Sequence, residues 1–506
     1  ILKRQTISEA ATIIAVITLL SKVIGYLRAV LVANYFGATS QTDAFFVAML
    51  IPSMVLGIVA GGLHLVVIPV YTEKREMNPE NARVFVNQIF FIVFVILFCL
   101  SMIMLAFPTV FVKLVAYGFK GDRLLLATYF MRYLIIFGFF NVFIGFLTGI
   151  YQTEKQFLYP SIVSLIGNSL IPLSLFFLTP FIGINSWTVG QISSALFAFF
   201  ALFTMLWWKR GFFREFYLKN IDWVEIRRFG ALLLPIILTS GIAGINQIVD
   251  KTVASSLATG SIAALSFAQK VYLIPFGLLA VPLTISVYPT FSSLAAGRNY
   301  KSYADTFQKT FSFAMYIMIP ISVIFISLSQ PIVRILFQHG AFDANATNVT
   351  AFAVSMYSIG LFFLSANELM RRGFFSFKDT KTPLYLSAYI VSINIAGNLI
   401  LSRILGVGGI ALATTIAATI GFFLYSYMLR KKGYTRDVRY KPLLKEAVKV
   451  VSASIIVGIL SLFFRSFIYT ADIFLLLIAR FILVLIILAV IYLLLSFIFK
   501  LDGFNM

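Results

Sequence analysis

The residues of this sequence best suited to chemistry are charged side chains inside apolar segments. Lys22 and Arg28 lie in the segment 9–36, and Lys270 lies in the segment 261–291. A cation near the middle of a bilayer costs at least ~2.5–3.5 kcal/mol, so such cations face a bundle interior or a watery cavity. Arginine binds phosphate through paired hydrogen bonds, and lysine acts as a point charge. These residues therefore predict a site for a phosphate-bearing anion.

Further charged residues inside the apolar segments are candidates for gating or supporting roles. The cations outnumber the acids Asp43 and Asp250. Excess buried positive charge is costly unless an anion binds to it. In an alternative interpretation, Lys22 and Arg28 snorkel or pair with Asp43 as a structural lock. The supporting set comprises Asp43, Asp250, Lys251, His64 and Arg132.

For two members of this set, the sequence is compatible with either a functional or a structural role. His64 follows "AGG" in the segment 43–70, where a substrate or proton role and ordinary packing are both compatible with the sequence. Arg132 lies in the segment 124–151, where a structural ion pair or a snorkelling side chain is the alternative to a functional role. The residues around them do not decide between these interpretations.

Motifs for catalysis are absent from the sequence. It contains no G-x-x-x-x-G-K-[ST] loop, no HExxH and no G-x-S-x-G. The single cysteine, Cys99, cannot form an internal disulfide, and no paired metal-ligand spacing occurs. We therefore expect a transporter rather than an enzyme, with neither a metal nor another bound cofactor.

The composition indicates a membrane protein. The chain has 506 residues, of which 60% are hydrophobic and 12% are charged, whereas soluble proteins average ~25% charged residues. The formal net charge of +21 could suggest nucleic-acid binding. However, the basic residues lie in short loops between apolar runs, as the positive-inside rule predicts, so we expect no nucleic-acid partner.

The fold class predicted from these runs is an all-α polytopic membrane protein with fourteen transmembrane helices. A span needs ~20 mostly apolar residues. The first run has no cleavage site and is interpreted as a retained helix. The candidate spans are 9–36, 43–70, 84–112, 124–151, 158–180, 185–208, 228–257, 261–291, 303–328, 346–374, 383–403, 407–430, 446–468 and 472–499. Loop charges place both termini in the cytoplasm.

An internal repeat predicts two pseudo-symmetric lobes. An offset of 223 aligns Arg28 with Lys251 and Gly37 with Gly260. We therefore expect two six-helix lobes in parallel orientation, with the substrate site between them near the midplane. The predicted domains are an N-terminal lobe 1–211, a C-terminal lobe 212–433 and two additional transmembrane helices within 434–506.

Several segments resemble one known family along the whole chain. The stretch "SKVIGYLRAVLVANYFGATSQTDAFFVAMLIP" is similar to the first two helices of MurJ (MviN) lipid II flippases, in the MOP superfamily. "ALSFAQKVYLIPFGLLAVPLTISVYPTFS", "RILFQHGAFD" and "FFSFKDTKTP" resemble later family segments. The sequence departs from the family pattern at Ala29 and Gln269, where the family often has acids, and at "VLGIVAGG", which replaces a basic pair and an acid common in helix 2 of the family.

The resemblance implies a function and roles for particular residues. The family moves an undecaprenyl-diphosphate-linked peptidoglycan precursor from the inner to the outer leaflet by alternating access. Lys22, Arg28 and Lys270 match cavity cations that engage the diphosphate, and Asp43 matches a family acid. The last two helices, around Ile455 and Val484, would form a groove for the lipid tail.

The sequence as a whole therefore predicts a lipid II flippase of the bacterial cytoplasmic membrane, involved in peptidoglycan and cell wall biogenesis. Its partners would be a lipid-linked anionic glycan and membrane lipids, and we expect a functional monomer. Coupling to membrane potential or a monovalent cation would drive it. Alternatives are a flippase for another lipid-linked oligosaccharide, a cation-coupled multidrug exporter of the same superfamily, or a membrane enzyme acting on polyprenyl phosphates.

Overall fold

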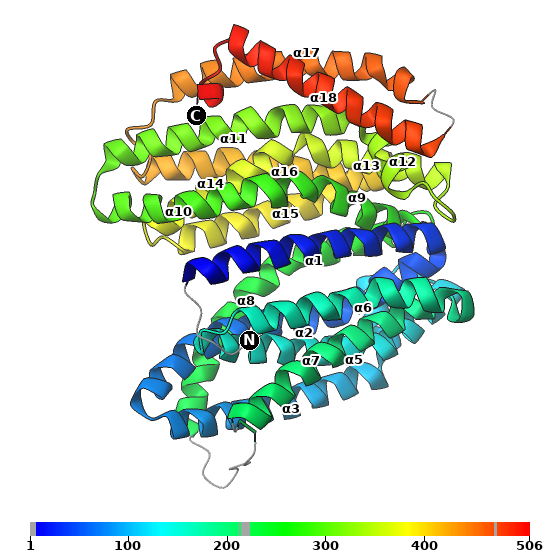
Figure 1. The fold of residues 1–506 in the computed structure, drawn as a ribbon, viewed down its shortest axis with the longest axis vertical. Coiled ribbons are helices and arrows are strands. Elements are labelled where there is room, and N and C mark those ends of the chain that lie inside the picture. The colour runs from blue at the N-terminus through cyan, green and yellow to red at the C-terminus, as the bar shows by residue number, and fades with distance from the viewer. Residues whose placement is uncertain (1–6, 211, 214–222, 470–472, 506) are drawn as a thin grey trace. The chain divides into compact units, whose positions relative to one another are not determined.

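In the part of the chain that this computed structural model describes, every long secondary-structure element is a helix. It describes residues 7–210, 212–213, 223–469 and 473–505, without the side chains of 7–15, 209–210, 238–240, 242–243 and 504–505. Two compact units, Ile1–Thr259 and Gly260–Met506, divide the chain. Figure 1 labels their helices. The all-α fold class predicted from the sequence is confirmed.

The first unit holds eight of the described helices, two of them bounded by proline. α3 and α4 each begin at a proline, whose missing N–H is tolerated in the first turn. The bounds are α1 (Ile7–Phe36), α2 (Ser40–Met77), α3 (Pro79–Ala106), α4 (Pro108–Val115), α5 (Gly121–Thr153), α6 (Leu158–Ile182), α7 (Asn185–Arg210) and α8 (Trp223–Ala254).

The second unit holds the remaining described helices. A π-helical turn, η1, interrupts the span that the sequence predicts at 261–291, directly after Pro275. The bounds are α9 (Ser261–Pro275), η1 (Phe276–Ala280), α10 (Val281–Ala296), α11 (Tyr300–Ser327), α12 (Ser329–Phe337), α13 (Ala344–Ile359), α14 (Leu361–Ser376), α15 (Lys381–Leu405), α16 (Val407–Lys431), α17 (Tyr440–Tyr469), α18 (Phe474–Ile498) and η2 (Asp502–Asn505).

The described helices are long and apolar enough to cross a membrane many times. Twelve candidate spans lie in the described residues, one of them the continuous run of α9, η1 and α10, and α13 with α14 qualifies as a further span bent by 44°. The bend lies at Gly360, where an added Cβ would come within 2.7 Å of Thr415 Oγ1. The predicted seventh crossing, 228–257, coincides with α8, and the count of thirteen leaves α8 aside because it covers only residues whose side chains are described. The number fourteen therefore stays a prediction.

Two short helices were missed from the sequence. The predicted span 84–112 ends at Ala106, and α4 starts separately after Phe107. Likewise α12 follows α11 across Leu328. A continuous apolar run conceals the break between α3 and α4, whereas α12 lies just beyond the predicted span 303–328.

Backbone geometry supports the internal repeat. Lys155 and Lys378, which are 223 positions apart, both have positive φ, at 56° and 59°. Gly183 and Gly406, with the same offset, have nearly identical dihedrals. Non-glycine residues rarely adopt positive φ. Turns with matching dihedrals at positions 223 residues apart therefore indicate that the two halves of the chain share one helical arrangement.

The placement of α8 bears on the predicted lobe boundary. α8 packs with α2 in the first unit. Ion pairs join the two helices, Lys74–Glu225 at 3.2 Å and Arg228–Glu73 at 3.1 Å. The domains 1–211, 212–433 and 434–506 stay predictions, and in this structure the first compact unit extends beyond residue 211 to include α8.

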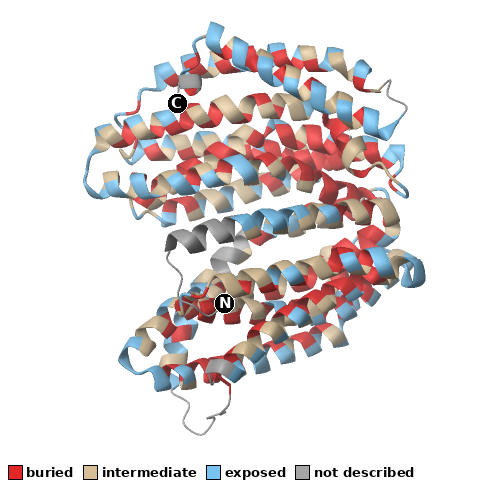
Figure 2. Cartoon of the chain, viewed as in Figure 1, coloured by how far each residue is buried: buried red, intermediate tan, exposed pale blue. Residues whose placement is uncertain are grey.

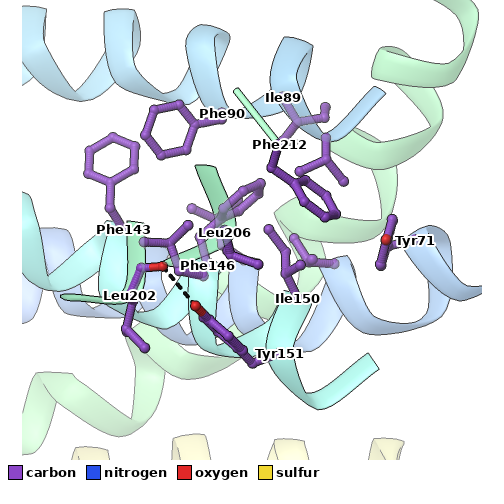
Figure 3. Packing of buried hydrophobic residues seen from close by; sticks show 14 of the residues in the cluster. Tyr71, Ile89, Phe90, Phe143, Phe146, Ile150, Tyr151, Leu202, Leu206 and Phe212 are labelled. Carbon is purple, nitrogen blue, oxygen red and sulfur yellow. Dashed lines mark hydrogen bonds between the residues drawn. The ribbon is translucent and has the colours of Figure 1, made fainter. Parts of the chain in front are cut away.

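An aromatic core holds the first unit together. Phe90 packs on Phe143 and Phe213, with ring centroids 4.8 and 4.7 Å apart. Tyr151 O–H donates a hydrogen bond to the Leu202 carbonyl at 2.9 Å (Figure 3). In lipid, packing and interhelical hydrogen bonds rather than hydrophobicity hold helices together. These contacts join α3, α5 and α7.

Exposed apolar side chains mark the surface that faces lipid. Leu475, Ile486 and Phe497 of α18 are all more than half exposed. Exposed residues run along the helices of both units in Figure 2. Such surfaces are rare on soluble monomers, and they agree with a multi-pass membrane protein.

Candidate substrate-binding site

A cavity of about 490 Å³ opens inside the first unit. α1, α5, α6 and α7 supply nearly all of its wall. From α1 come Ile17, Thr18, Ser21 and Arg28. Residues seven apart return to nearly the same helix face, which explains why Ser21 and Arg28 both reach the cavity.

Arg28 is the one charged residue in the cavity wall, all of which lies within the described part of the chain. Its side chain is half-buried. No described residue forms an ion pair or hydrogen bond with its guanidinium. Withdrawing a cation from water without a partner costs free energy, so the arrangement favours an anionic ligand. In this structure Asp43 pairs with Arg123 rather than with Arg28.

Neutral polar side chains make up much of the remaining wall. On each helix they recur at spacings of three, four or seven residues, which place them on one face. The neutral polar members of the wall are Thr18, Ser21, Asn141, Thr148, Gln152, Ser161, Ser164, Asn168, Gln191 and Ser194. The sequence interpretation missed those of α5, α6 and α7, although polar residues at helical spacing in apolar spans were the signal.

Lys22 lies beside this cavity rather than in its wall. Six residues separate it from Arg28, which is roughly 120° around a helix of 3.6 residues per turn. Its side chain is exposed, and it is not a lining residue. The two cations of α1 therefore point in different directions.

Lys270 belongs to the second unit. Its Nζ lies 5.4 Å from the ring centroid of Phe267 on the same helix, α9. The neighbouring Gln269 donates a hydrogen bond to Tyr357 O–H at 3.1 Å, and Tyr357 stacks on Tyr272 at 4.3 Å. The convergence of Lys270 with Lys22 and Arg28 stays a prediction.

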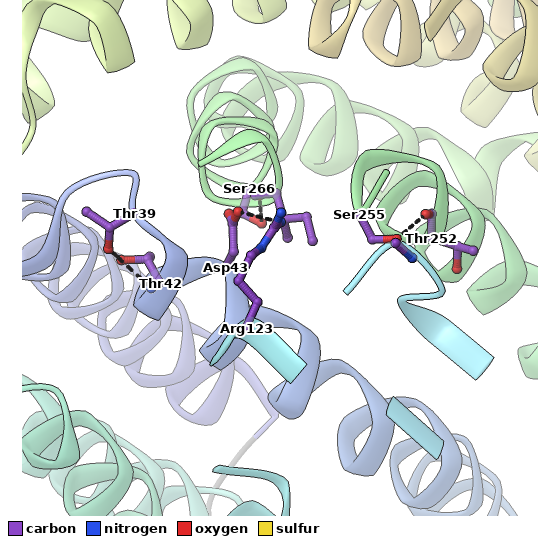
Figure 4. Close-up of polar contacts among 9 residues, drawn as sticks. Thr39, Thr42, Asp43, Arg123, Thr252, Ser255 and Ser266 are labelled. Carbon is purple, nitrogen blue, oxygen red and sulfur yellow. Dashed lines mark hydrogen bonds and ion pairs between the residues drawn. The ribbon is translucent and has the colours of Figure 1, made fainter. Parts of the chain in front are cut away.

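Asp43 is a paired charge. It is fully buried, and its Oδ2 lies 3.2 Å from Arg123 Nη2 of α5 (Figure 4). Asp43 occupies the first turn of α2, where the helix dipole favours an acid. Arg123 also stacks on Phe119 at 4.4 Å. The sequence interpretation missed Arg123, because it lies at the start of α5, 80 residues from Asp43.

Two further charges of the supporting set lie near this pair. Lys251 Nζ is 5.1 Å from the ring centroid of Phe46, one turn along α2 from Asp43. Both Asp43 and Asp250 attract the Lys251 ammonium, and Asp250 is buried. Asp43, Arg123, Asp250 and Lys251 therefore form a set with two acids and two cations, which we call the neutral cluster.

His64 and Arg132 take different positions. His64 Nδ1 is 3.1 Å from the Gly145 carbonyl oxygen. If Gly149 carried a Cβ atom, that atom would lie 3.2 Å from the His64 carbonyl oxygen. This close approach of α2 and α5 supports packing. Arg132 is exposed and is not among the cavity lining residues. Within the described residues, no group of three His, Cys, Asp or Glu could hold a metal ion.

Comparisons with known proteins all find lipid II flippases of the MurJ family. The protein-family model described as "Lipid II flippase MurJ" matches residues 32–499. A probable lipid II flippase MurJ of Buchnera aphidicola subsp. Baizongia pistaciae (strain Bp) is 27% identical over 477 residues, covering 91% of this chain and 90% of that protein. One from Rhizobium tropici is 25% identical over 437 residues, covering 82% and 80%.

Solved structures agree with the sequence relatives. A structure of lipid II flippase MurJ in an inward closed conformation has a TM-score of 0.80 and 26% identity, covering 97% of this chain and 99% of that one. An inward-facing MATE family multidrug transporter of the MOP superfamily has a TM-score of 0.71 at 15% identity, covering 82% and 96%. The second likeness shows a shared fold alone.

Proposed function

The chain belongs to the MurJ family of lipid II flippases, and on that premise we propose that Arg28, with Lys22 and Lys270, binds the diphosphate of lipid II. The family relationship makes this chain a multi-pass transporter of the cytoplasmic membrane rather than an enzyme, and its fold suits alternating access. The observation that carries the proposal is the Arg28 guanidinium, which faces a polar cavity without a carboxylate partner.

In this mechanism the headgroup of lipid II enters from the cytoplasmic leaflet while its tail stays in lipid. Arg28 makes charge-assisted hydrogen bonds to the diphosphate, which are stronger than neutral ones. Lys22 and Lys270 add positive charge along the route. A change between inward-open and outward-open states then delivers the headgroup to the outer leaflet.

The neutral cluster serves the same mechanism as a support. Its paired charges hold the start of α2 against the start of α5 and the end of α8. This contact fixes α2, which contributes Met49 to the cavity wall. Asp43, Asp250, Lys251 and Arg123 are therefore structural or gating residues rather than ligands of the substrate.

Energy for the cycle must come from outside the protein, since the sequence lacks an ATP-binding loop. We assign it to the membrane potential or a monovalent cation gradient. A potential of 100 mV supplies about 2.3 kcal/mol per charge moved. Both termini lie in the cytoplasm, because the basic loops define that side, and one chain suffices for transport.

Cellular complementation tests this proposal. The essential lipid II flippase of a test bacterium is depleted and replaced by this chain, by Arg28→Ala or by Lys270→Ala. Lys113→Ala, at an exposed position on α4, is the matched control. Accessibility of lipid II at the outer leaflet is measured with expression levels.

Rescue by the parent chain and the control, with loss in both cavity variants, is the expected result. Failure of the well-expressed parent chain would contradict lipid II transport. Rescue by the parent and both cavity variants would keep the substrate and overturn the role of the cations.

A further inference from the structure

Three arginines of the second unit lie where α17 ends and α18 begins. The Arg334 guanidinium carbon of α12 is 5.4 Å from the ring centroid of Tyr469, the last residue of α17. The Arg465 guanidinium carbon is 5.7 Å from the same centroid. Arg480 of α18 donates a hydrogen bond to the Phe467 carbonyl at 3.0 Å. Two of these cations therefore share one aromatic ring, and we call Arg334 and Arg465 the arginine pair.

Neutral side chains are the described partners of the arginine pair. Arg465 donates a hydrogen bond to Gln330 Oε1, and Gln330 Nε2 in turn donates one to Asn348 Oδ1 at 2.8 Å. Among the described residues, no carboxylate forms an ion pair with either guanidinium. Both arginines are half-buried, and neighbouring like charges disfavour one another. The arrangement therefore favours an anion at this place.

The acids close to the arginine pair in sequence do not balance its charge. Asp343 caps α13, where its Oδ1 accepts a hydrogen bond from the Ala346 N–H at 2.7 Å. Asp472 lies outside the described residues, and by sequence it brings one negative charge to a region with three arginines. Positive charge is in excess at this end of the second unit.

The Tyr469 hydroxyl is a further donor at this place. Its oxygen is buried, and it donates to no acceptor among the described residues. Buried polar groups normally have a hydrogen-bond partner. A phosphate oxygen accepts hydrogen bonds from a phenol and from guanidinium groups, and those from guanidinium are charge-assisted and strong. The hydroxyl and the arginine pair therefore suit the same ligand.

Apolar side chains next to the arginine pair narrow the class of ligand. α17 and α18 are consecutive candidate spans, so the residues that join them lie at one surface of the membrane. Ile473 and Leu475, at the start of α18, are more than half exposed. The His339 ring packs 4.6 Å from the Phe474 ring and holds the segment after α12 against α18 (Figure 1). A ligand with both a phosphate and an apolar tail fits these surroundings.

We propose that Arg334, Arg465 and Tyr469 bind the phosphate of an anionic phospholipid whose acyl chains lie against Ile473 and Leu475. This site is separate from the cavity that contains Arg28 and does not depend on the function proposed above. In the alternative interpretation, the arginine pair only extends toward water at the membrane surface, as long basic side chains do at helix ends. The diphosphate of a lipid-linked glycan and free inorganic phosphate offer similar oxygens, so the experiment must separate them from a phospholipid.

Native mass spectrometry of the purified full chain in neutral detergent tests the site. Phosphatidylglycerol is titrated, and phosphatidylcholine serves as a lipid with a phosphate but no net charge. Inorganic phosphate is added as a competitor, and lipid II is titrated separately. The variants are Arg334→Gln, Arg465→Gln and Tyr469→Phe. Arg403→Gln, at an exposed arginine in the last turn of α15, is the matched control.

We expect each arginine variant to lose about tenfold in affinity for phosphatidylglycerol, the effect of a hydrogen bond to a charged group, and Tyr469→Phe to lose about threefold. Affinity for phosphatidylcholine and for lipid II, and the behaviour of Arg403→Gln, should stay unchanged. Thermal unfolding identifies any variant that fails to fold, and the others then carry the test.

Three results would overturn the phospholipid site. Unchanged affinity for phosphatidylglycerol in the folded variants, or an equal loss in Arg403→Gln, would show that the arginine pair only extends toward water. Displacement of the lipid by an equal concentration of inorganic phosphate would indicate a site for free anions. An equal loss of lipid II affinity would assign the arginine pair to the transported substrate.

Discussion

Two charged sites of the first unit differ in how their charges are satisfied. In the neutral cluster, Arg123 contacts Asp43 at 3.2 Å, and the carboxylate is fully buried. In the cavity, Arg28 faces hydroxyl and carboxamide groups and no described acid. Paired charges preserve a structure, whereas an unpaired cation in a polar cavity stays available to a ligand. The contrast separates a structural role from a binding role.

The largest expected effect comes from breaking the neutral cluster. Asp43→Ala leaves the Arg123 guanidinium without its carboxylate, and removing one partner of a buried pair costs about 3–5 kcal/mol. We expect a marked fall in the thermal unfolding midpoint of the purified protein in detergent.

A second substitution provides the control. Arg123→Met in the Asp43→Ala background removes the orphaned charge, so it should restore much of the lost stability. If Asp43→Ala unfolds at the parent temperature, the pair is not structural and the comparison fails.

Removing the unpaired cation should have the opposite thermodynamic signature. Arg28→Gln deletes a half-buried charge that lacks a protein partner. The free energy of unfolding should stay within about 1 kcal/mol of the parent or rise, because a desolvation cost disappears. Transport of lipid II should nevertheless fall by tenfold or more. A destabilised Arg28→Gln protein would show that the guanidinium supports the fold.

A smaller effect is expected at His64, which packs where α2 approaches α5. His64→Leu removes the contact with the Gly145 carbonyl and should cost about 0.5–1.5 kcal/mol, the value of one hydrogen bond. Transport should survive this substitution. Loss of transport at unchanged thermal stability would instead support the proton role that the sequence leaves open.

The smallest effect concerns a charge pair outside the membrane spans. Burial raises the pKa of Asp379, but hydrogen bonds from Thr382 and Lys432 outweigh it and bring the pKa below its ordinary value. The Lys432 ammonium lies 2.9 Å from Asp379 Oδ2. The stability from this carboxylate is present above its unfolded pKa of about 3.9 and is lost as pH falls through the lower folded value.

Asp379→Asn tests this pair by thermal unfolding between pH 6 and pH 3. The parent should be slightly more stable above about pH 4, and the difference should shrink as the pH falls below that value. A difference that does not depend on pH would show that hydrogen bonding alone, not charge, stabilises this turn.

Much of the architecture could be predicted because a span requires a long apolar run. The predicted span 383–403 lies within α15, and 407–430 lies within α16. The division of 84–112 into α3 and α4 was missed, since an apolar run gives no sign of a change in direction. The break inside 346–374 depends on Gly360 meeting Thr415 of another helix, a contact far apart in sequence.

The candidate site was predicted in part for a similar reason. Arg28 is conspicuous in an apolar helix, so its type and place predict a role. Its lack of a partner is a spatial fact that the sequence does not contain. Asp43 was recognised but its partner Arg123 was not, because pairing across 80 residues depends on the fold. The carboxamides of the cavity were overlooked because neutral polar residues are common in bundles.

The affinity of the purified chain for lipid II, measured for the parent and Arg28→Gln, tests the central claim most directly. Loss of charge-assisted hydrogen bonds worth about 1.5–3 kcal/mol should weaken binding by roughly tenfold or more, while thermal stability holds. Equal affinity in a folded Arg28→Gln protein would contradict the claim that the unpaired guanidinium of the cavity is the anchor for the substrate.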